Sequence, residues 1–394
     1  MQIQTCAIWS LPNELLILIT AYLPQESLRS LTQVCSLFRE VATPPFFRLL
    51  HFVLPDVTIF FHIEHTVLEA LSVWRRTKAF VMPDSIWFSV TEATTDRHLN
   101  ALSAFFESLQ GYDPVPRVHL QLPRAPRQPT ASFNRLLNCI LASGCKDLHC
   151  HDVQQPYRKP QTYLKSSYFT RAPSCDSKIE VLEITSSIFY SLMVIPFTIT
   201  TLRNSPITHL ILTNVPFTTA QWSTFLIHLS LPHLLSLEVD GSCPTHSLVN
   251  FLARHNVTRL TFSRGHPTVP CSSHAPAYLP LPSLECLNGP PACIHSLASL
   301  AKLTTLETLT VRFCPTSSTV PFLEEVLACT AHFPNLDDLQ VRIPSGADHC
   351  LLKTPRKPHP SCLVKTLFLM CLDSAKHDII VCAIVLSFLY TITE

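Results

Sequence analysis

The sequence is poor in charged side chains. Asp, Glu, Lys and Arg make up 14% of its 394 residues, whereas an average soluble domain holds roughly 25%. The formal net charge is only +1 at pH 7, so the chain has no long-range field that would attract nucleic acid or an anionic membrane. We therefore expect neither nucleic acid nor membrane among its partners. A largely uncharged surface is typical of a protein that works in complexes.

Glycine is also scarce, which excludes several classes of enzyme. The six glycines are scattered, so the chain holds neither GxGxxG nor GxxxxGK, the patterns of phosphate-binding loops. The GxSxG and HExxH motifs do not occur, and His62 and His65 have the wrong spacing for two zinc ligands on one helical face. No nucleophile, base and orienting group can be brought together from these residues. We predict no catalytic residue and no cofactor.

Cysteine is present in a moderate amount, at 16 of 394 residues, a share of about 4% that lies well below that of small disulfide-rich scaffolds. Residues 1–7 are expected to be an N-terminal leader. The first ten residues hold no basic side chain, and the apolar run after them is interrupted by Asn13 and Glu14, unlike a secretory signal peptide. We expect a reduced protein of the cytoplasm, the nucleus or both.

One short segment combines cysteine and histidine. Cys145, His149, Cys150 and His151 lie within seven residues and could in principle bind a metal ion. In a strand, however, alternate side chains point to opposite faces. In the repeat register Cys145, Leu148 and Cys150 face the core, and alternation along the strand sends His149 and His151 to the other face. We interpret them as core cysteines beside surface histidines, and predict no metal site.

The apolar segment IIVCAIVLSFLYTI occupies residues 379–392. Its fourteen residues are fewer than the roughly twenty that a membrane-spanning helix needs. We favour a terminal packing helix, and a membrane anchor is the alternative.

The first regular pattern in the chain is LPNELLILITAYLP, residues Leu11–Pro24. Eight of the nine residues from Leu15 to Leu23 are apolar, so a helix built from them is apolar nearly all round and needs cover on more than one side. A second apolar series with helical spacing follows Pro24, and Thr43-Pro44-Pro45 predicts its end. Short helices in a segment of about forty residues bury too little surface to be stable without a partner.

This segment resembles an F-box, whose usual pattern is LPxELLxxIxxYL followed by a spaced Leu, Leu, VC and Phe-Arg or Phe-Lys. The resemblance covers residues 8–52 and implies that the uncovered helical face binds the Skp-family adaptor of a cullin-RING ubiquitin ligase. The residues that match the pattern, and that we assign to this contact, are Leu11, Pro12, Leu15, Leu16, Ile19, Tyr22, Leu23, Leu28, Leu31, Val34, Cys35 and Phe38. The alternative is that they cap the apolar end of the remaining chain.

A second pattern, apolar-x-x-Leu-x-apolar, recurs through the rest of the sequence. Its clearest copies are ITHLILTNV from Ile207, LLSLEVDGS from Leu234, VTRLTFSRG from Val257, LETLTVRFC from Leu306 and LDDLQVRIP from Leu336. The central residues of all ten copies are Val118, Leu148, Leu182, Leu210, Leu237, Leu260, Leu284, Leu309, Leu339 and Leu367. The first and last centres are 249 residues apart over nine steps, a mean period of about 28 that lies within the range of leucine-rich repeats.

Helix-like stretches such as residues 245–255 and 322–333 separate these copies. A short strand, a helix and another strand imply right-handed units and a parallel sheet. We therefore predict an α/β fold in which a small helical F-box precedes an irregular leucine-rich-repeat solenoid, with strands on the concave face and helices on the convex face. A connecting helical segment with an atypical first repeat is expected at 53–110. The solenoid, with its C-terminal packing helix, is expected at 111–394.

The strand positions that alternate with the inward leucines should line the concave face. The candidates for substrate binding are Glu183, His209, Ile211, Glu238, Asp240, Arg259, Glu285, Arg312 and Arg342, together with Thr261, Thr310 and Gln340 in the same row. The series is acidic in its middle and basic toward its C-terminal end. It predicts a partner with a basic patch near the acidic residues and an acidic element near the two last arginines.

Together these patterns predict a substrate-recognition subunit of an SCF-type cullin-RING E3 ubiquitin ligase. The F-box would hold the adaptor while the repeats bind a protein substrate whose identity the sequence does not give. Such a subunit raises the effective concentration of substrate and ubiquitin and has no catalytic residue. The alternative is an F-box and leucine-rich-repeat scaffold that acts outside ubiquitin transfer.

Overall fold

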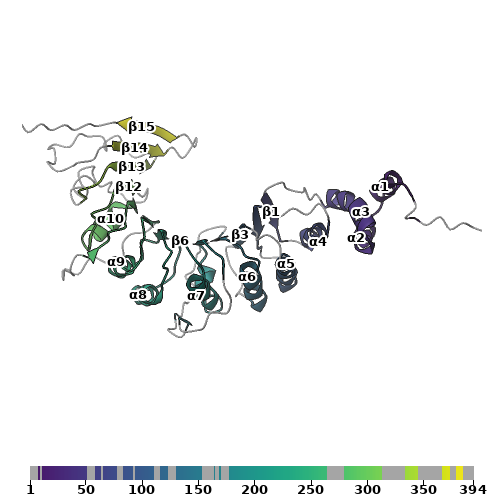
Figure 1. The fold of residues 1–394 in the computed structure, drawn as a ribbon, viewed down its shortest axis with the longest axis horizontal. Coiled ribbons are helices and arrows are strands. Elements are labelled where there is room, and N and C mark those ends of the chain that lie inside the picture. The colour runs from purple at the N-terminus through teal and green to yellow at the C-terminus, as the bar shows by residue number, and fades with distance from the viewer. Residues whose placement is uncertain are drawn as a thin grey trace, which may run out of the picture. The chain divides into compact units, whose positions relative to one another are not determined.

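The structure is a computed structural model of the chain. It describes residues 8, 11–50, 58–63, 65–77, 83–91, 94–110, 116–122, 130–152, 164, 168–169, 177–263, 279–312, 333–344, 366–372 and 379–384. The chain divides into two compact units, the first made of 1–155 with 177–179 and the second of 156–176 with 180–394. Figure 1 shows the helices and strands of both units and labels many of them. A helical N-terminal segment precedes parallel strands that alternate with helices, so the fold is the predicted α/β, solenoid-like one.

Three helices form the beginning of the first unit. They are α1, Asn13–Ala21; α2, Gln25–Val34; and α3, Ser36–Leu49. Pro12 and Pro24 precede α1 and α2, at positions where the missing N–H of proline interrupts no helical hydrogen bond. A buried cluster holds α1 and α3 together and consists of Leu16, Phe38 and Val41, with Leu11, Leu31 and Leu37 packed against it.

Helix α3 is longer than the sequence predicts. The motif Thr43-Pro44-Pro45 was expected to end it, but the helix continues to Leu49. Proline inside a helix removes a backbone donor and costs about 3 kcal/mol or more. The completely buried Phe46 and the nearly buried Phe47 follow the two prolines, and burial of each ring contributes energy of a similar size. Tertiary packing therefore outweighs the local preference at this point.

The rest of the first unit alternates strands and helices. Its strands β1, Thr58–His62; β2, Ser85–Ser89; β3, Arg117–Leu122; and β4, Asp147–Asp152 pair in parallel in this order. Its helices are α4, His65–Trp74; α5, Asp96–Ser108; and α6, Ala131–Ala142. The described residues of segment 53–110 therefore form two strand–helix units, where a connecting helical segment and one atypical first repeat were expected. The strands TIFFH and SIWFS are aromatic and lack the leucine pattern that marks the later copies.

Alternation along the strands positions the core of the first unit. Ile86, Val118 and Leu148 are partners on neighbouring strands and are completely buried. Cys145 and Cys150 are also completely buried, as the sequence predicted. His149 and His151 take the alternate positions of β4 and are partly exposed.

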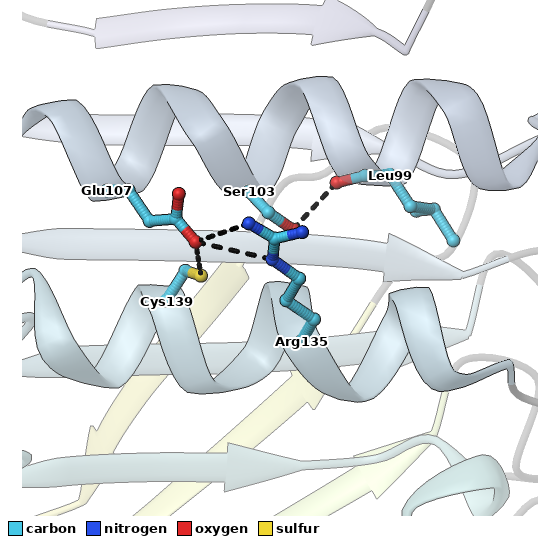
Figure 2. Close-up of polar contacts among 5 residues, drawn as sticks. All are labelled: Leu99, Ser103, Glu107, Arg135 and Cys139. Carbon is cyan, nitrogen blue, oxygen red and sulfur yellow. Dashed lines mark hydrogen bonds and ion pairs between the residues drawn. The ribbon is translucent and has the colours of Figure 1, made fainter.

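A polar cluster joins helices α5 and α6. Arg135 donates two hydrogen bonds to Oε1 of Glu107, at 2.9 Å from its Nη2 and 3.3 Å from its Nε, and Cys139 Sγ lies 3.4 Å from the same oxygen (Figure 2). The bond from Arg135 lowers the pKa of Glu107. Burial and the Glu107 carboxylate raise the pKa of Cys139 to about 11. Cys139 is therefore a neutral thiol at physiological pH and not a reactive nucleophile.

The second unit repeats the strand–helix pattern more regularly. Its parallel strands are β5, Val181–Ile184; β6, His209–Leu212; β7, Ser236–Val239; β8, Arg259–Phe262; β10, Cys286–Gly289; β12, Thr308–Arg312; β13, Asp338–Pro344; and β14, Thr366–Leu372, which pair in this order. Two further strands, β9, Leu279–Pro280, and β11, Ala301–Lys302, pair with each other.

Helices connect the strands of the second unit. They are the short 3₁₀ helix η3, Ser187–Tyr190; α7, Ile195–Asn204; α8, Thr219–His228; α9, Thr245–Leu252; and α10, Pro291–Ala298. Helices α7 to α10 lie along one side of the strands (Figure 1). The stretch 322–332, for which a helix was expected, lies outside the described residues. We call the strand face turned away from these helices the open face.

Leucines in register form the core of the second unit. The partners Leu182, Leu210, Leu237, Leu260, Leu287, Leu309 and Leu339 are each at most 2% exposed. The predicted centres are correct except for Leu284, because Leu287 is the residue that pairs with Leu260. The peptide LECLNG offers two leucines three residues apart. Leu284 has the full motif, with Leu281 and Cys286, whereas the copy centred on Leu287 ends in Gly289. The pairing of Leu287 with Leu260 places Gly289 against Phe262. A Cβ added at Gly289 would lie 3.0 Å from the Cβ of Phe262.

The predicted C-terminal packing helix is wrong in its described part. Ile379–Ile384 forms strand β15, antiparallel to β14. The sequence IIVCAI is rich in β-branched residues, which favour a strand, whereas the prediction relied on length and hydropathy. Residues 385–392 lie outside the described part of the chain. Among the described residues, no helix is long and apolar enough to cross a membrane.

Candidate functional site

Helix α1 exposes an unusual number of large apolar side chains. Leu15 is 46% exposed, Ile17 and Leu18 are 56%, Ile19 is 42%, and Tyr22, which directly follows the helix, is 83%. We call these five residues the α1 apolar surface. Residues 15, 18, 19 and 22 have the spacing of one helical face. An apolar helical face left open to water marks an interaction site more often than a region of no function.

The structure sorts the predicted adaptor-binding residues into three groups. Pro12, Leu15, Ile19, Tyr22, Val34 and Cys35 are exposed, whereas Leu11, Leu23 and Leu31 are half-buried. Leu16, Leu28 and Phe38 are buried. For these last three the assignment to a contact surface is wrong, because their side chains fill the domain's own core. Ile17 and Leu18 were missed, since a segment that is apolar nearly all round does not show which side is covered.

Polar contacts join the α1–α3 segment to helix α4. Arg29 on α2 forms an ion pair with Glu69 on α4, at 2.9 Å between Nη1 and Oε1. Arg39 on α3 donates from Nη1 to the backbone carbonyl of Arg76 at 3.2 Å and from Nε to that of Thr32 at 2.9 Å. Contacts of this kind near a protein surface contribute about 1 kcal/mol or less each, although Glu69 itself is only 13% exposed. They nevertheless orient the three helices against the first strand–helix unit.

The open face of the second unit carries a row of mostly polar side chains. Strand register aligns Glu183, Ile211, Glu238, Thr261, Asn288, Thr310 and Gln340 across seven strands. We call this the central row. Glu285 was expected in it but precedes β10, and Asn288 takes its place because the centre of that copy is Leu287. His209 and Arg259 lie in the adjacent row, with Ser236 between them.

The acidic residues Asp240 and Glu238 differ in how far their carboxylates are open to a binding partner. Asp240 is only 9% exposed. Its Oδ2 accepts a bond from the backbone N–H of Val215 at 2.8 Å, and its Oδ1 accepts one from Ser263 Oγ at 3.1 Å. The carboxylate thus holds two neighbouring segments together, and the expectation that Asp240 contacts a substrate is wrong for this reason. Glu238 remains half-buried on the open face, and burial raises its pKa while Arg312 acts against that rise.

The basic end of the open face is formed by two arginines on adjacent strands. Arg312 and Arg342 are register partners. Nε of Arg312 donates to Oδ1 of Asn288 at 2.6 Å. Burial and the charge of Arg342 lower the pKa of Arg312, whereas Glu238 raises it. No described residue accepts a hydrogen bond from the buried Nε of Arg342. Two like charges with spare donors favour an anionic group as ligand.

Comparison with known proteins supports the interpretation of the N-terminal segment. Residues 8–52 match the family model described as F-box-like. No curated protein matches the chain. A similar solved structure is the crystal structure of the Rad7 and Elc1 complex in yeast, with 14% identity, a TM-score of 0.36 and coverage of 89% of this chain and 92% of that chain. Similarity of this degree carries no argument about function. Residues 8–52 of this chain form an F-box-like domain.

Proposed function

We propose that this protein is a substrate-recognition subunit of an SCF-type cullin-RING E3 ubiquitin ligase. In this proposal the F-box-like domain binds a Skp-family adaptor, and the strand–helix units bind a protein substrate. The observation that carries it is the α1 apolar surface within a segment that matches the F-box-like family.

The distribution of apolar residues supports adaptor binding at α1. Leu16 packs inward with Phe38, which leaves Leu15, Leu18 and Ile19 on the outside of the same helix. Covering a large aliphatic side chain contributes about 1.5 to 3 kcal/mol when it is fully removed from water. Several such residues on one helix provide enough energy for a specific protein contact after the cost of association is met.

The proposed role is positional rather than catalytic. A subunit that binds the ligase through α1 and a substrate through another surface makes the transfer of ubiquitin effectively intramolecular. The Cys139 thiol is held neutral, and burial raises the pKa of Cys145 to about 12. Neither cysteine therefore offers the thiolate that a ubiquitin-carrying enzyme would require.

The central row is the proposed substrate-binding surface of the second unit. Glu183 and Glu238 present carboxylates in the first half of the row, and Arg312 and Arg342 present guanidinium groups beside its end, on β12 and β13. We propose a partner segment that carries a basic group toward the glutamates and a carboxylate or phosphate group toward the arginines. Few charges are available on this chain, so this opposite-sign pair of sites provides orientation as well as affinity.

The adaptor contact is tested by the double variant Leu18→Glu with Ile19→Glu in the full chain. Both side chains are exposed, so folding should be preserved, and two charges on the apolar surface should reduce recovery of the Skp-family adaptor in a pull-down by at least about tenfold. The matched control is Ile227→Glu on α8, which alters an apolar residue that is 62% exposed. Unchanged recovery with a folded double variant would refute the proposal.

A separate measurement distinguishes the ligase subunit from the alternative scaffold. The scaffold would bind the adaptor equally well but would not assemble with a cullin. Quantitative detection of the cullin in the same pull-down separates them, because both proposals predict loss of adaptor in the α1 double variant and only one predicts a cullin with the wild type.

The substrate surface is tested by charge reversal on the central row. Glu183→Lys with Glu238→Lys should reduce binding of partners that accumulate when substrate turnover is blocked, while the adaptor contact stays intact. Glu307→Lys is the control, because Glu307 is exposed just before β12 and outside the row. Equal loss in both variants, or loss in neither, would contradict the assignment of this face.

A further inference from the structure

Three histidines on two neighbouring strands meet on one face of the first unit. His119 on β3 is the register partner of His149 on β4, and His151 follows two residues later on the same face. Each offers a ring nitrogen, and these three nitrogens all lie within 4.8 Å of one another. His119 is only 7% exposed, whereas His149 and His151 are partly open. The cluster therefore has one inner residue and two outer ones.

Ring stacking limits the freedom of this cluster. The centroids of His119 and His149 are 4.3 Å apart with planes inclined by 14°, and Trp87 stacks on the other side of His119 at 3.6 Å and 12°. Trp87 is itself held by a hydrogen bond from its Nε1 to Ser85 Oγ at 3.1 Å. The ring of His151 lies 6.2 Å from that of His119 and 6.0 Å from that of His149.

We propose that His119, His149 and His151 form a binding site for a divalent transition metal ion, with Zn²⁺ as the expected ion. Imidazole nitrogen suits Zn²⁺, and the Zn–N distance is about 2.0 to 2.1 Å, so two nitrogens of a tetrahedral site are separated by about 3.3 Å. Nitrogens within 4.8 Å of one another lie near this separation. Because imidazole binds a metal in the plane of its ring, the partly open rings of His149 and His151 would turn out of the stack to aim their nitrogens at one ion. The fourth position is open to water or to a group from a bound partner.

All three proposed ligands are nitrogen atoms. The site therefore differs from the mixed set of two cysteines and two histidines at residues 145–151, which the sequence analysis rejected. Cys150 is completely buried and alternates with the two histidines along β4, and Cys145, which precedes the strand, is completely buried as well. One strand cannot bring its two faces to a single ion. The ligand that completes the set comes instead from β3, through the pairing of His119 with His149. This inference does not depend on the proposed role in ubiquitin transfer.

The test is a titration of the tag-free full chain with Zn²⁺, followed by calorimetry or by competition with a chromogenic chelator. His149→Phe and His151→Phe keep a flat ring and remove both nitrogens, and each should weaken Zn²⁺ binding by about tenfold or more. His209→Phe is the control, because His209 is exposed on the open face of the second unit. Unchanged affinity and stoichiometry in the folded variant His149→Phe with His151→Phe would overturn the proposal.

A second measurement uses the wild type and so does not depend on how the variants fold. X-ray absorption of the chain loaded with one equivalent of Zn²⁺ should show nitrogen and oxygen neighbours with scattering from about three imidazole rings. With Co²⁺, fluorescence quenching should be smaller in Trp87→Phe than in the wild type, because Trp87 stacks directly on His119. Sulfur neighbours, or fewer than two imidazoles, would overturn the site.

Discussion

Helix α1 and the leucine core of the second unit are built from the same residue types but differ in what covers them. Leu15, Leu18 and Ile19 are roughly half exposed, whereas Leu237 and Leu260 are almost completely buried. Both sets follow a regular apolar spacing in the sequence. Apolar content alone therefore does not separate a core from a docking surface. The difference depends on whether the same chain supplies the second side, as helices α7 to α10 do for the strands.

The largest expected effect on stability tests this comparison directly. Leu237→Ala should lower the free energy of unfolding by about 2 to 5 kcal/mol, because it removes a buried side chain and leaves a cavity. Leu18→Ala removes the same atoms from an exposed position and should change the free energy of unfolding by less than about 0.5 kcal/mol. Chemical denaturation of the two variants measures the difference.

The two variants should have the opposite order of effects on adaptor binding. Leu18→Ala should weaken the adaptor contact, whereas folded Leu237→Ala should leave it unchanged. If Leu18→Ala destabilised the chain as much as Leu237→Ala, α1 would be covered by this chain and the docking surface would not exist.

An intermediate effect is expected at Gly289, where the leucine core has no room for a larger residue. An added Cβ would lie 3.0 Å from Cβ and 3.1 Å from Cδ2 of Phe262, which is 2% exposed. Gly289→Ala should therefore destabilise the chain by about 1 kcal/mol, since overpacking typically costs 1 to 3 kcal/mol and the loss of glycine flexibility in the unfolded chain returns part of it.

The residue that an alanine at position 289 would crowd is Phe262. Combining Gly289→Ala with Phe262→Leu should give a smaller loss than the sum of the two single variants, because the shorter side chain makes room for the new methyl group. Additive losses in thermal or chemical unfolding would show that the two positions are not in contact.

The sequence predicted most of the second unit because its signal is periodic. Each leucine must face the helices once per repeat, so the period gives both the strands and their register. The sequence-based prediction failed at two places. In one copy Leu284 has the better motif but Leu287 is the residue in register, and the aromatic strands β1 and β2 carry no leucine. The candidate sites were harder. His119 is thirty residues from His149 in the sequence, and only strand pairing brings their rings together.

Burial was the other property that the sequence did not give. Nothing in the letters around Leu15, Leu16 and Leu18 shows that only the middle one is covered, because the helix is apolar nearly all round. Asp240 presents the same problem for a polar residue. Its position after β7 indicated a surface charge, but the carboxylate accepts bonds from Val215 and Ser263. Long-range contacts decide both cases.

The smallest effect is expected at the exposed ion pair between α5 and α6, which joins two helices by charge rather than by apolar packing. Glu107→Gln removes the carboxylate that Arg135 binds, and the loss of stability should be much smaller than that for Leu237→Ala, since exposed pairs are screened by water and salt.

The pKa of Glu107 is lowered in the folded chain. Its contribution is therefore present above the unfolded pKa and disappears as the pH falls through the lowered folded pKa. Unfolding measured at neutral pH should show the difference between wild type and Glu107→Gln. The difference should shrink in high salt and vanish in acid, and a difference that persisted in acid would mean that packing of the side chain, not its charge, joins the helices.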